Sequence, residues 1–281
     1  MNKFLTGLLL TAFVLFAPQA VRAEAADKAK VHEFDFVMAH KPDNEQNVAL
    51  INEFTKRVFE RTNGQVKINP VDAAKRYGGD ALNSWTLERV KNELYTGEIG
   101  MSQVSLKKFD DYCPTIDALD MPMVFRDHDH VKKVVDGPIG QQVIQDLYKG
   151  SDEEIKGLAF TYSGGFRNIY TTVKPVHSVA ELNGMVMRGR SNRTSRDAVH
   201  YLGLVQNYGL NYDWVAANAR GQILAEEAET LRLLTYAHTN PELIKNIKTV
   251  LVTNHSVFLT LVAINGDLFK SLTKEQQNII Q

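Results

Sequence analysis

Five arginines gather between residues 167 and 196, and one of them ends a short apolar run. The run Met185–Met187 is typical of a buried strand, and Arg188 follows it directly. A buried charge without a partner costs several kcal/mol, so Arg188 needs a carboxylate from this chain or from a ligand. A guanidinium is a planar fork that pairs with both carboxylate oxygens at once. The position predicts an anion-binding group, with a buried structural ion pair as the alternative.

The other four arginines predict different roles. Arg167 directly follows the glycine-rich stretch 163–166. Arg193 and Arg196 are typical of an exposed basic face, and Arg190 shares the loop after Arg188 without its central role. The candidate anchor is therefore Arg188.

Signatures of catalysis are absent from the sequence. It contains no G-x-S-x-G, P-loop, H-E-x-x-H, paired C-x-x-C or G-x-G-x-x-G motif. The stretch Asp127–His130 suggests a metal site, but histidines two apart on a helix point away from each other. Asp127 fits a helix N-cap better, and Cys113 lies beside Pro114 without a histidine motif. We expect no enzyme activity, no metal and no cofactor.

Composition and the first residues indicate export. The chain has 281 residues, 44% hydrophobic and 23% charged, and a formal charge of -1, which disfavours nucleic acid as a partner. Residues 1–23 have the layout of a secretory signal peptide, with Lys3 before an apolar run too short to span a bilayer. Cys113 is the only cysteine, so no intramolecular disulfide is possible. These features predict a soluble, monomeric periplasmic protein.

Strand and helix patterns alternate along the chain. Strands are expected at 31–40, 65–71 and 99–105, with helices at 47–61 and 82–95, which favours an α/β fold with a largely parallel sheet. Further on, we expect helices from Asp127 and at 178–182 and 193–202, a helix–turn pattern over 214–229, strands at 154–162 and 254–266, and a capping box of Thr273 and Gln276. The glycines of 163–166 suggest a pivot between two lobes. Ligands of such folds bind at the carboxyl ends of strands and between domains.

Five stretches carry a resemblance to a known family. They are FTKRVFERTNGQVKI (54–68), YGGDA (77–81), ALDMPMVFRDHDH (118–130), GGFRNIYTTVKPVHSVAELNGMVMR (164–188) and TNHSVFLTLVAIN (253–265). In order and spacing the chain resembles the substrate-binding protein of a tripartite ATP-independent periplasmic (TRAP) transporter of the dicarboxylate-binding type, from about residue 32 to the end.

The resemblance implies a two-lobed periplasmic binding protein fold, with a hinge and a ligand cleft between the lobes. Lobe one would be residues 24–164 with 254–281, and lobe two residues 165–253. The lobes would close over a small organic acid and deliver it to integral membrane transporter subunits, which an ion gradient drives.

The resemblance also implies site residues. Arg188 ends the block that supplies the central bidentate salt bridge to the substrate carboxylate, and Arg167 matches an assisting arginine. His40 and Ser105 match positions that commonly face the cleft.

The match departs from the family pattern in two places. Asn211 stands where an aromatic residue is usual, and with Tyr212 and Trp214 it offers replacement contacts for a different ligand. The pattern G-V-V-D-G-x-E-N-P becomes GQILAEEAE (221–229), which keeps Glu227 as a candidate ligand contact but puts Ala228 in place of an anchoring Asn. A charge-assisted hydrogen bond contributes about 1.5–3 kcal/mol, so its loss weakens a typical ligand roughly 10- to 150-fold.

Three alternatives stay open from the sequence. One is a receptor that presents its ligand to a membrane sensor. Another is a divergent paralogue with altered or lost ligand binding, or a truncated form, because the chain is shorter than is usual in the family. An enzyme is the third, against which the absent motifs argue.

Overall fold

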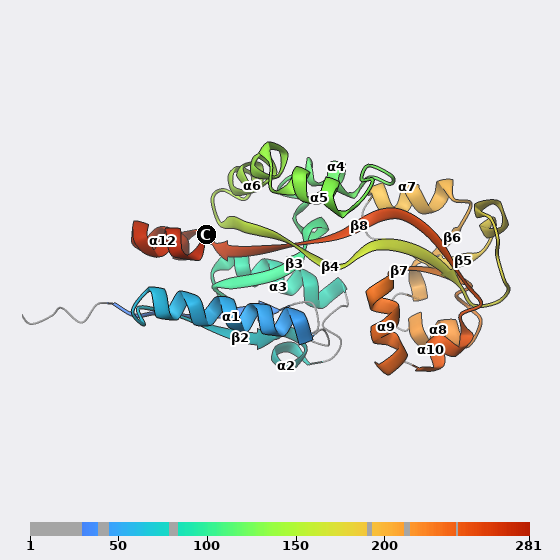
Figure 1. Cartoon of the computed structure of the whole chain (residues 1–281), viewed down its shortest axis with the longest axis horizontal. Coiled ribbons are helices and arrows are strands. Elements are labelled where there is room, and N and C mark those ends of the chain that lie inside the picture. The colour runs from blue at the N-terminus through green and yellow to red at the C-terminus, as the bar shows by residue number, and fades with distance from the viewer. Residues whose placement is uncertain (1–29, 39–44, 79–83, 190–192, 211–213, 240) are drawn as a thin grey trace, which may run out of the picture. The chain divides into compact units, whose positions relative to one another are not determined.

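A computed structural model describes residues 30–38, 45–78, 84–189, 193–210, 214–239 and 241–281. Within them one sheet has the strand order β2-β1-β3-β8-β4-β7-β5-β6 (Figure 1). Its strands are β1 (His32–Met38), β2 (Val66–Asp72), β3 (Met101–Ser105), β4 (Ile155–Thr171), β5 (Val186–Arg188), β6 (Val205–Asn207), β7 (Ala225–Glu229) and β8 (Thr249–Asn265).

The helices come from the segments between these strands. They are α1 (Glu45–Arg61), α2 (Ala73–Tyr77), α3 (Ser84–Thr96), α4 (Ile116–Asp120), α5 (His128–Val135), α6 (Pro138–Gly150), α7 (Arg193–Tyr201), α8 (Trp214–Ala219), α9 (Thr230–Thr239), α10 (Pro241–Asn246), α11 (Gly266–Ser271) and α12 (Lys274–Ile280), with short 3-10 turns η1 (Leu106–Phe109), η2 (Val179–Leu182) and η3 (Tyr208–Leu210). None of the described helices is both long and apolar enough to cross a bilayer.

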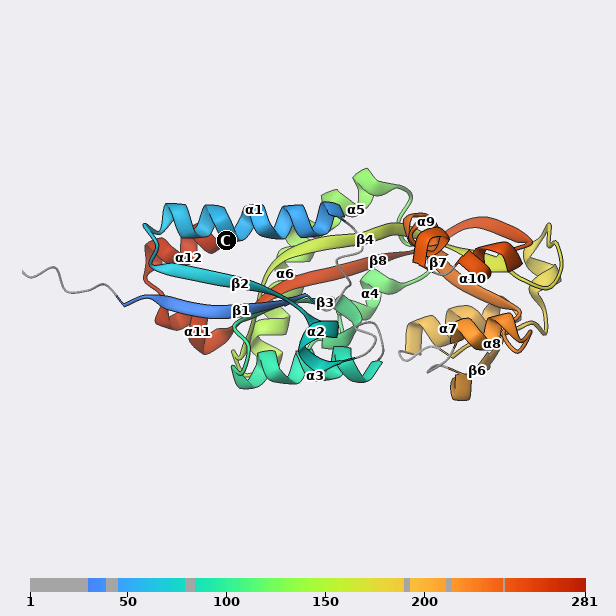
Figure 2. The same cartoon turned by 90° about the horizontal axis from the view of Figure 1, so that it is seen from below.

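Strand alternation gives the first half of the sheet two hydrophobic cores. Phe36 and Met38 of β1 pack with Ile51 and Val58 of α1, whereas Val37 between them packs in the other core, with residues of α3 and α6. Figure 2 accordingly shows α1 and α3 on opposite faces of β1 and β2. Both expected helices, and the three strands between and beside them, are confirmed.

Local capping signals in the sequence are confirmed as well. The Asp127 side chain accepts a hydrogen bond from the His130 backbone N–H at 2.7 Å and so caps α5. Thr273 and Gln276 form the reciprocal capping box of α12. Asn63 and Gly64 have φ of 51° and 77° and end α1.

The strand expected at 154–162 is longer than expected, because it continues through residues 163–166 to Thr171. β4 pairs antiparallel with β8 from Ile155 to Thr171, and its register shifts between Tyr162 and Phe166. Gly164 and Gly165 adopt φ of 113° and 89°, which a bulge accommodates without ending the strand. The two long strands run from the part of the sheet beside β3 to the part that holds β7 (Figure 1).

In the second half of the sheet, β6 was not expected from the sequence, and one further segment forms a different element from the one expected. The segment AEEAE was expected in a helix–turn pattern, but it forms β7, which is buried along its whole length between β4 and β5. The sheet is also mixed rather than largely parallel, because β8 and β4 run antiparallel to each other and to β3 and β7. Parallel pairing holds for β1 with β2 and β3, and for β5 with β6 and β7.

The bulge at Gly164 provides a test of the fold. A Cβ at Gly164 would lie 2.8 Å from Glu229 Cβ, so we expect Gly164→Ala to lower the free energy of unfolding by at least about 2 kcal/mol. Gly184 has φ of 81° with no atom within 4 Å of an added Cβ, so Gly184→Ala isolates the backbone strain of about 1 kcal/mol. Urea unfolding of both variants measures the loss in free energy of unfolding. Equal losses would contradict a close approach of Gly164 to Glu229.

Candidate functional site

Three buried glutamates of β7 form the centre of the site. In the β4–β7 register, Arg167 lies opposite Glu229 and Tyr170 lies opposite Glu226. Because successive side chains of a strand alternate between faces, Glu227 and Glu229 lie on the face of Arg167, and Glu226 lies on the other. Buried carboxylates need cationic or hydrogen-bonding partners. Arg167 is such a partner on one face of β7, and Arg188 is one on the other face.

Arg167 holds the two glutamates of its own face. Its Nη1 lies 2.6 Å from Glu227 Oε1 and its Nε 2.9 Å from Glu229 Oε1. The second oxygen of Glu227 lies 2.8 Å from His255 Nε2, and Arg232 Nε lies 3.4 Å from Glu229 Oε2. Burial lowers the pKa of Arg167, but the carboxylates around it raise that pKa by more, so it stays charged. Arg167 is thus the centre of a buried cluster of ion pairs.

A second cluster adjoins Arg167 and joins distant segments. Lys107 of η1 forms an ion pair with Asp120 at the end of α4. Lys107 Nζ also donates to Ser195 Oγ of α7 at 2.6 Å, and that hydroxyl donates to Asp120 Oδ2 at 3.0 Å. Burial lowers the pKa of Lys107 and the charge of Arg167 lowers it further, against the opposing effect of Asp120. These contacts connect Lys107 and Asp120, which precede residues 163–166 in the sequence, with α7, which follows them.

Arg188 has its partner on the opposite face of β7. Met187 of β5 pairs with Ala225 in the parallel register. The next residues of the two strands, Arg188 and Glu226, are therefore neighbours across the two strands. Arg188 Nε lies 3.0 Å from Glu226 Oε2, while Glu226 Oε1 accepts the Glu227 backbone N–H at 2.9 Å. The Glu226 side chain is 1% exposed, but that of Arg188 is 26% exposed. Glu226 thus supplies a carboxylate to Arg188, whose side chain is partly exposed to solvent.

The remaining predicted site residues are placed only in part. Ser105 ends β3, is buried, and stands two residues before Lys107. His40 and Asn211 lie outside the described residues, as does Tyr212, and Trp214 begins α8. The described contacts put Arg167 and Arg188 in two ion-pair groups, one on each face of β7.

Sequence analysis missed several residues of these groups, namely Lys107, Asp120, Ser195, Glu226, Glu229 and His255. The signal that could have found some of them is the set of three glutamates in AEEAE, since the strand is buried on both faces and its carboxylates need partners. Three carboxylates so placed require cations, and Arg167 and Arg188 precede them in the chain.

The histidines of α5 have packing roles in the structure. The His128 ring meets the Phe166 ring edge-on with centroids 5.0 Å apart, and His130 packs similarly on Phe125. Among the described residues no group of three or more His, Cys, Asp or Glu is arranged to hold a metal ion. Cys113 is a buried free thiol.

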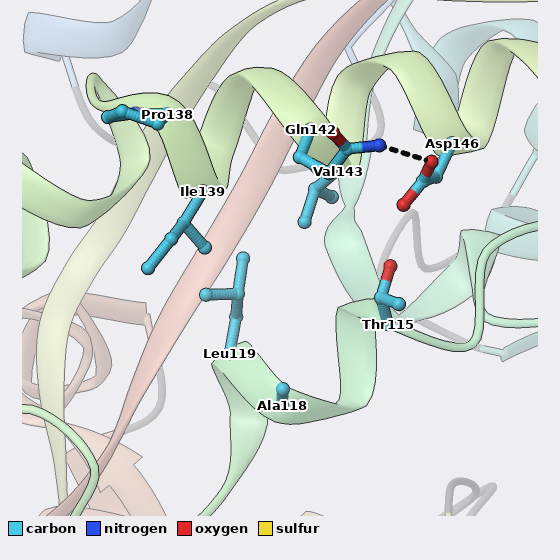
Figure 3. A pocket seen from close by; sticks show the side chains of 8 residues that line it. All are labelled: Thr115, Ala118, Leu119, Pro138, Ile139, Gln142, Val143 and Asp146. Atoms are coloured by element: carbon cyan, nitrogen blue, oxygen red, sulfur yellow. Dashed lines mark hydrogen bonds between the residues drawn. The ribbon is translucent and has the colours of Figure 1, made fainter.

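A hollow of ≈ 340 Å³ lies apart from the arginines, between α4 and α6 (Figure 3). Leu119, Ile139 and Val143 give it apolar walls, and Thr115 and Asp146 stand at one end. Near Arg167, Lys107 and Asp120 border a cavity of ≈ 10 Å³, the space of about one water molecule. The charged groups, not the larger hollow, hold the chemistry that a carboxylate ligand would use.

The sequence places the chain in a defined family. Residues 36–207, more than half of the chain, match the model of bacterial extracellular solute-binding proteins, family 7 (DctP). The chain belongs to this family, which is one of solute-binding proteins and not of enzymes.

Curated relatives are similar over part of their length. A C4-dicarboxylate-binding protein of Bacillus subtilis is 28% identical over 173 residues, which cover 62% of this chain and 45% of the relative. The 2,3-diketo-L-gulonate-binding periplasmic protein of Escherichia coli is 27% identical over 143 residues, covering 51% and 40%. The chain spans just under half the length of the first of these.

Solved structures confirm the two-lobed α/β fold. A TRAP periplasmic solute-binding protein from Pseudomonas putida F1 with bound D-glucuronate has a TM-score of 0.72 and 27% identity, covering 88% of this chain and 76% of that one. Another from Ochrobactrum anthropi has a TM-score of 0.74 and 20% identity, covering 90% and 73%. The resemblance inferred from the five stretches is therefore confirmed at the level of family and fold.

Loss of Arg167 tests the internal cluster. Arg167→Met would leave Glu227 and Glu229 without their guanidinium, and we expect the free energy of unfolding to fall by about 3–5 kcal/mol. Arg193→Met is the control, since the Arg193 side chain is 83% exposed and should contribute less than about 1 kcal/mol. Urea unfolding measures both. A loss at Arg167 no larger than that at Arg193 would show that the cluster does not stabilise the fold.

Proposed function

We propose that the chain is a periplasmic receptor that binds a small organic acid between two lobes and delivers it to the membrane subunits of a TRAP transporter. Family membership supports solute binding, and a side chain that presents a guanidinium at the carboxyl end of a strand supports a carboxylate ligand. Residues 1–23 would direct export as a signal peptide and be removed.

The observation that carries the proposal is the exposure of Arg188 beside a fixed partner. Arg167 shows that one guanidinium in this protein binds two carboxylates at once, through Nη1 and Nε. Arg188 pairs with Glu226 through Nε. A ligand carboxylate would bind to the same guanidinium and accept two parallel hydrogen bonds from its N–H groups. In this proposal Arg188 is the anchor, and Arg167 assists by fixing Glu227 and Glu229.

The lobes of the proposal follow the boundaries expected from the sequence. Residues 24–164 with 254–281 would form lobe one and residues 165–253 lobe two, joined by β4 and β8. The contact of Lys107 and Asp120 with Ser195 would then hold the lobes together on closure. His40, Ser105, Asn211 and Glu227 would contribute to the ligand cleft.

The ligands named for the similar proteins indicate which class of ligand to test. D-glucuronate, C4-dicarboxylates and 2,3-diketo-L-gulonate all carry a carboxylate. Ala228 is buried against Tyr170 and Leu243 and provides no polar anchor, which favours a ligand different from the usual one, as in a divergent paralogue. Presentation of the acid to a membrane sensor is the other use of the same site.

A thermal-shift screen with organic acids tests Arg188. An acid at 100 times its Kd should add about 2.7 kcal/mol to the wild-type stability. Arg188→Ala should abolish that gain, and Arg188→Lys, which keeps the charge but not the fork, should weaken binding at least about tenfold.

Arg193→Ala is the matched control, because it removes an exposed arginine from the neighbouring helix. Circular dichroism checks that each variant is folded. Ligand shifts that persist in folded Arg188→Ala would refute the anchor role.

A further inference from the structure

Glu226 compensates the charge of Arg188 before any ligand arrives. The two residues are cross-strand neighbours on β7 and β5, with Nε and Oε2 3.0 Å apart. The second oxygen accepts the Glu227 backbone N–H, and the side chain is 1% exposed. The carboxylate is thus fixed in place and shielded from water and salt, so its field acts at close range with little screening.

Glu226 is the carboxylate that faces Arg188 on its side of β7. On the other face, Arg167 pairs with both Glu227 and Glu229, Arg232 also pairs with Glu229, and Lys107 pairs with Asp120. A singly charged acid would bring one negative charge beside Glu226 and gain the bidentate pairing with Arg188. The second carboxylate of a dianion adds another charge near Glu226, where like charges repel.

We propose that Glu226 is a specificity-determining residue that makes the receptor prefer singly charged acids to doubly charged acids of the same size. The inference rests on the proposed function, because it requires a carboxylate bound at Arg188. It assigns Glu226 a task apart from holding the strand together. Glu226 disfavours dicarboxylates by its charge and orients the guanidinium by its contact with Nε.

Matched ligands test this on the wild-type protein. Succinamate and succinate differ by an amide in place of one carboxylate, and glutaramate and glutarate differ in the same way by one charge. Isothermal titration calorimetry at neutral pH should show the singly charged member of each pair binding at least about tenfold more tightly. A dianion that binds as well as its partner, or better, overturns the inference.

Glu226→Gln separates charge from shape. The amide has nearly the same size and retains an oxygen that accepts hydrogen bonds, so we expect the preference to shrink at least about tenfold, mainly through tighter binding of the dianion. Glu226→Asp keeps the charge and should keep the direction of the preference. Glu242→Gln is the control, since that side chain is 75% exposed on α10 and its loss should leave the preference unchanged.

The outcomes distinguish this inference from the proposed function. An unchanged preference in folded Glu226→Gln overturns the role of Glu226 while leaving carboxylate binding intact. If none of the four acids binds the wild-type protein, carboxylate binding at Arg188 and the inference fail together. Should Glu226→Gln not fold, the wild-type ligand pairs still decide.

Discussion

Pairing of the buried glutamates of β7 with arginines from neighbouring strands is the interaction on which the site depends. The side chains of β7 are buried on both faces of the sheet, so each carboxylate needs a partner within the fold. Arg167 meets Glu227 and Glu229 on one face, and Arg188 meets Glu226 on the other. The pairing with Glu226 also fixes the position of the partly exposed guanidinium of Arg188. In the proposed site, strand stability and ligand recognition would share one set of charges.

The long antiparallel pair of β4 and β8 brings these charges to residues of the first half of the sheet. β4 carries Arg167 next to the Gly164–Gly165 bulge, and β8 carries His255, which reaches Glu227. The bulge lets the backbone pass close to Glu229 without interrupting the pairing. Lys107, Asp120 and Ser195 add a polar contact across the same region. A change of lobe orientation would act on all of these groups together.

Sequence patterns predicted the elements whose signals are local. Apolar periodicity identified α1 and β1, and side-chain chemistry identified the caps at Asp127 and Thr273. β7 was not predicted because AEEAE has no alternation of apolar and polar residues. Its burial depends on arginines far away in the chain, and Arg167 and Glu227 are 60 residues apart. Gly164 and Gly165 form a bulge within β4, and the sequence could not show that the strand continues past them, because its partner β8 lies far along the chain. Arg188 was recognised as a candidate anchor, whereas its internal partner required the register of β5 and β7.

A crystal structure of the protein with an acid from the ligand screen tests the central claim most directly. The account predicts carboxylate oxygens at hydrogen-bond distance, about 2.7–2.9 Å, from the terminal nitrogens of Arg188. Glu226 should still lie on Nε in that complex. An acid bound away from Arg188, with that side chain in contact only with residues of the chain, would contradict it.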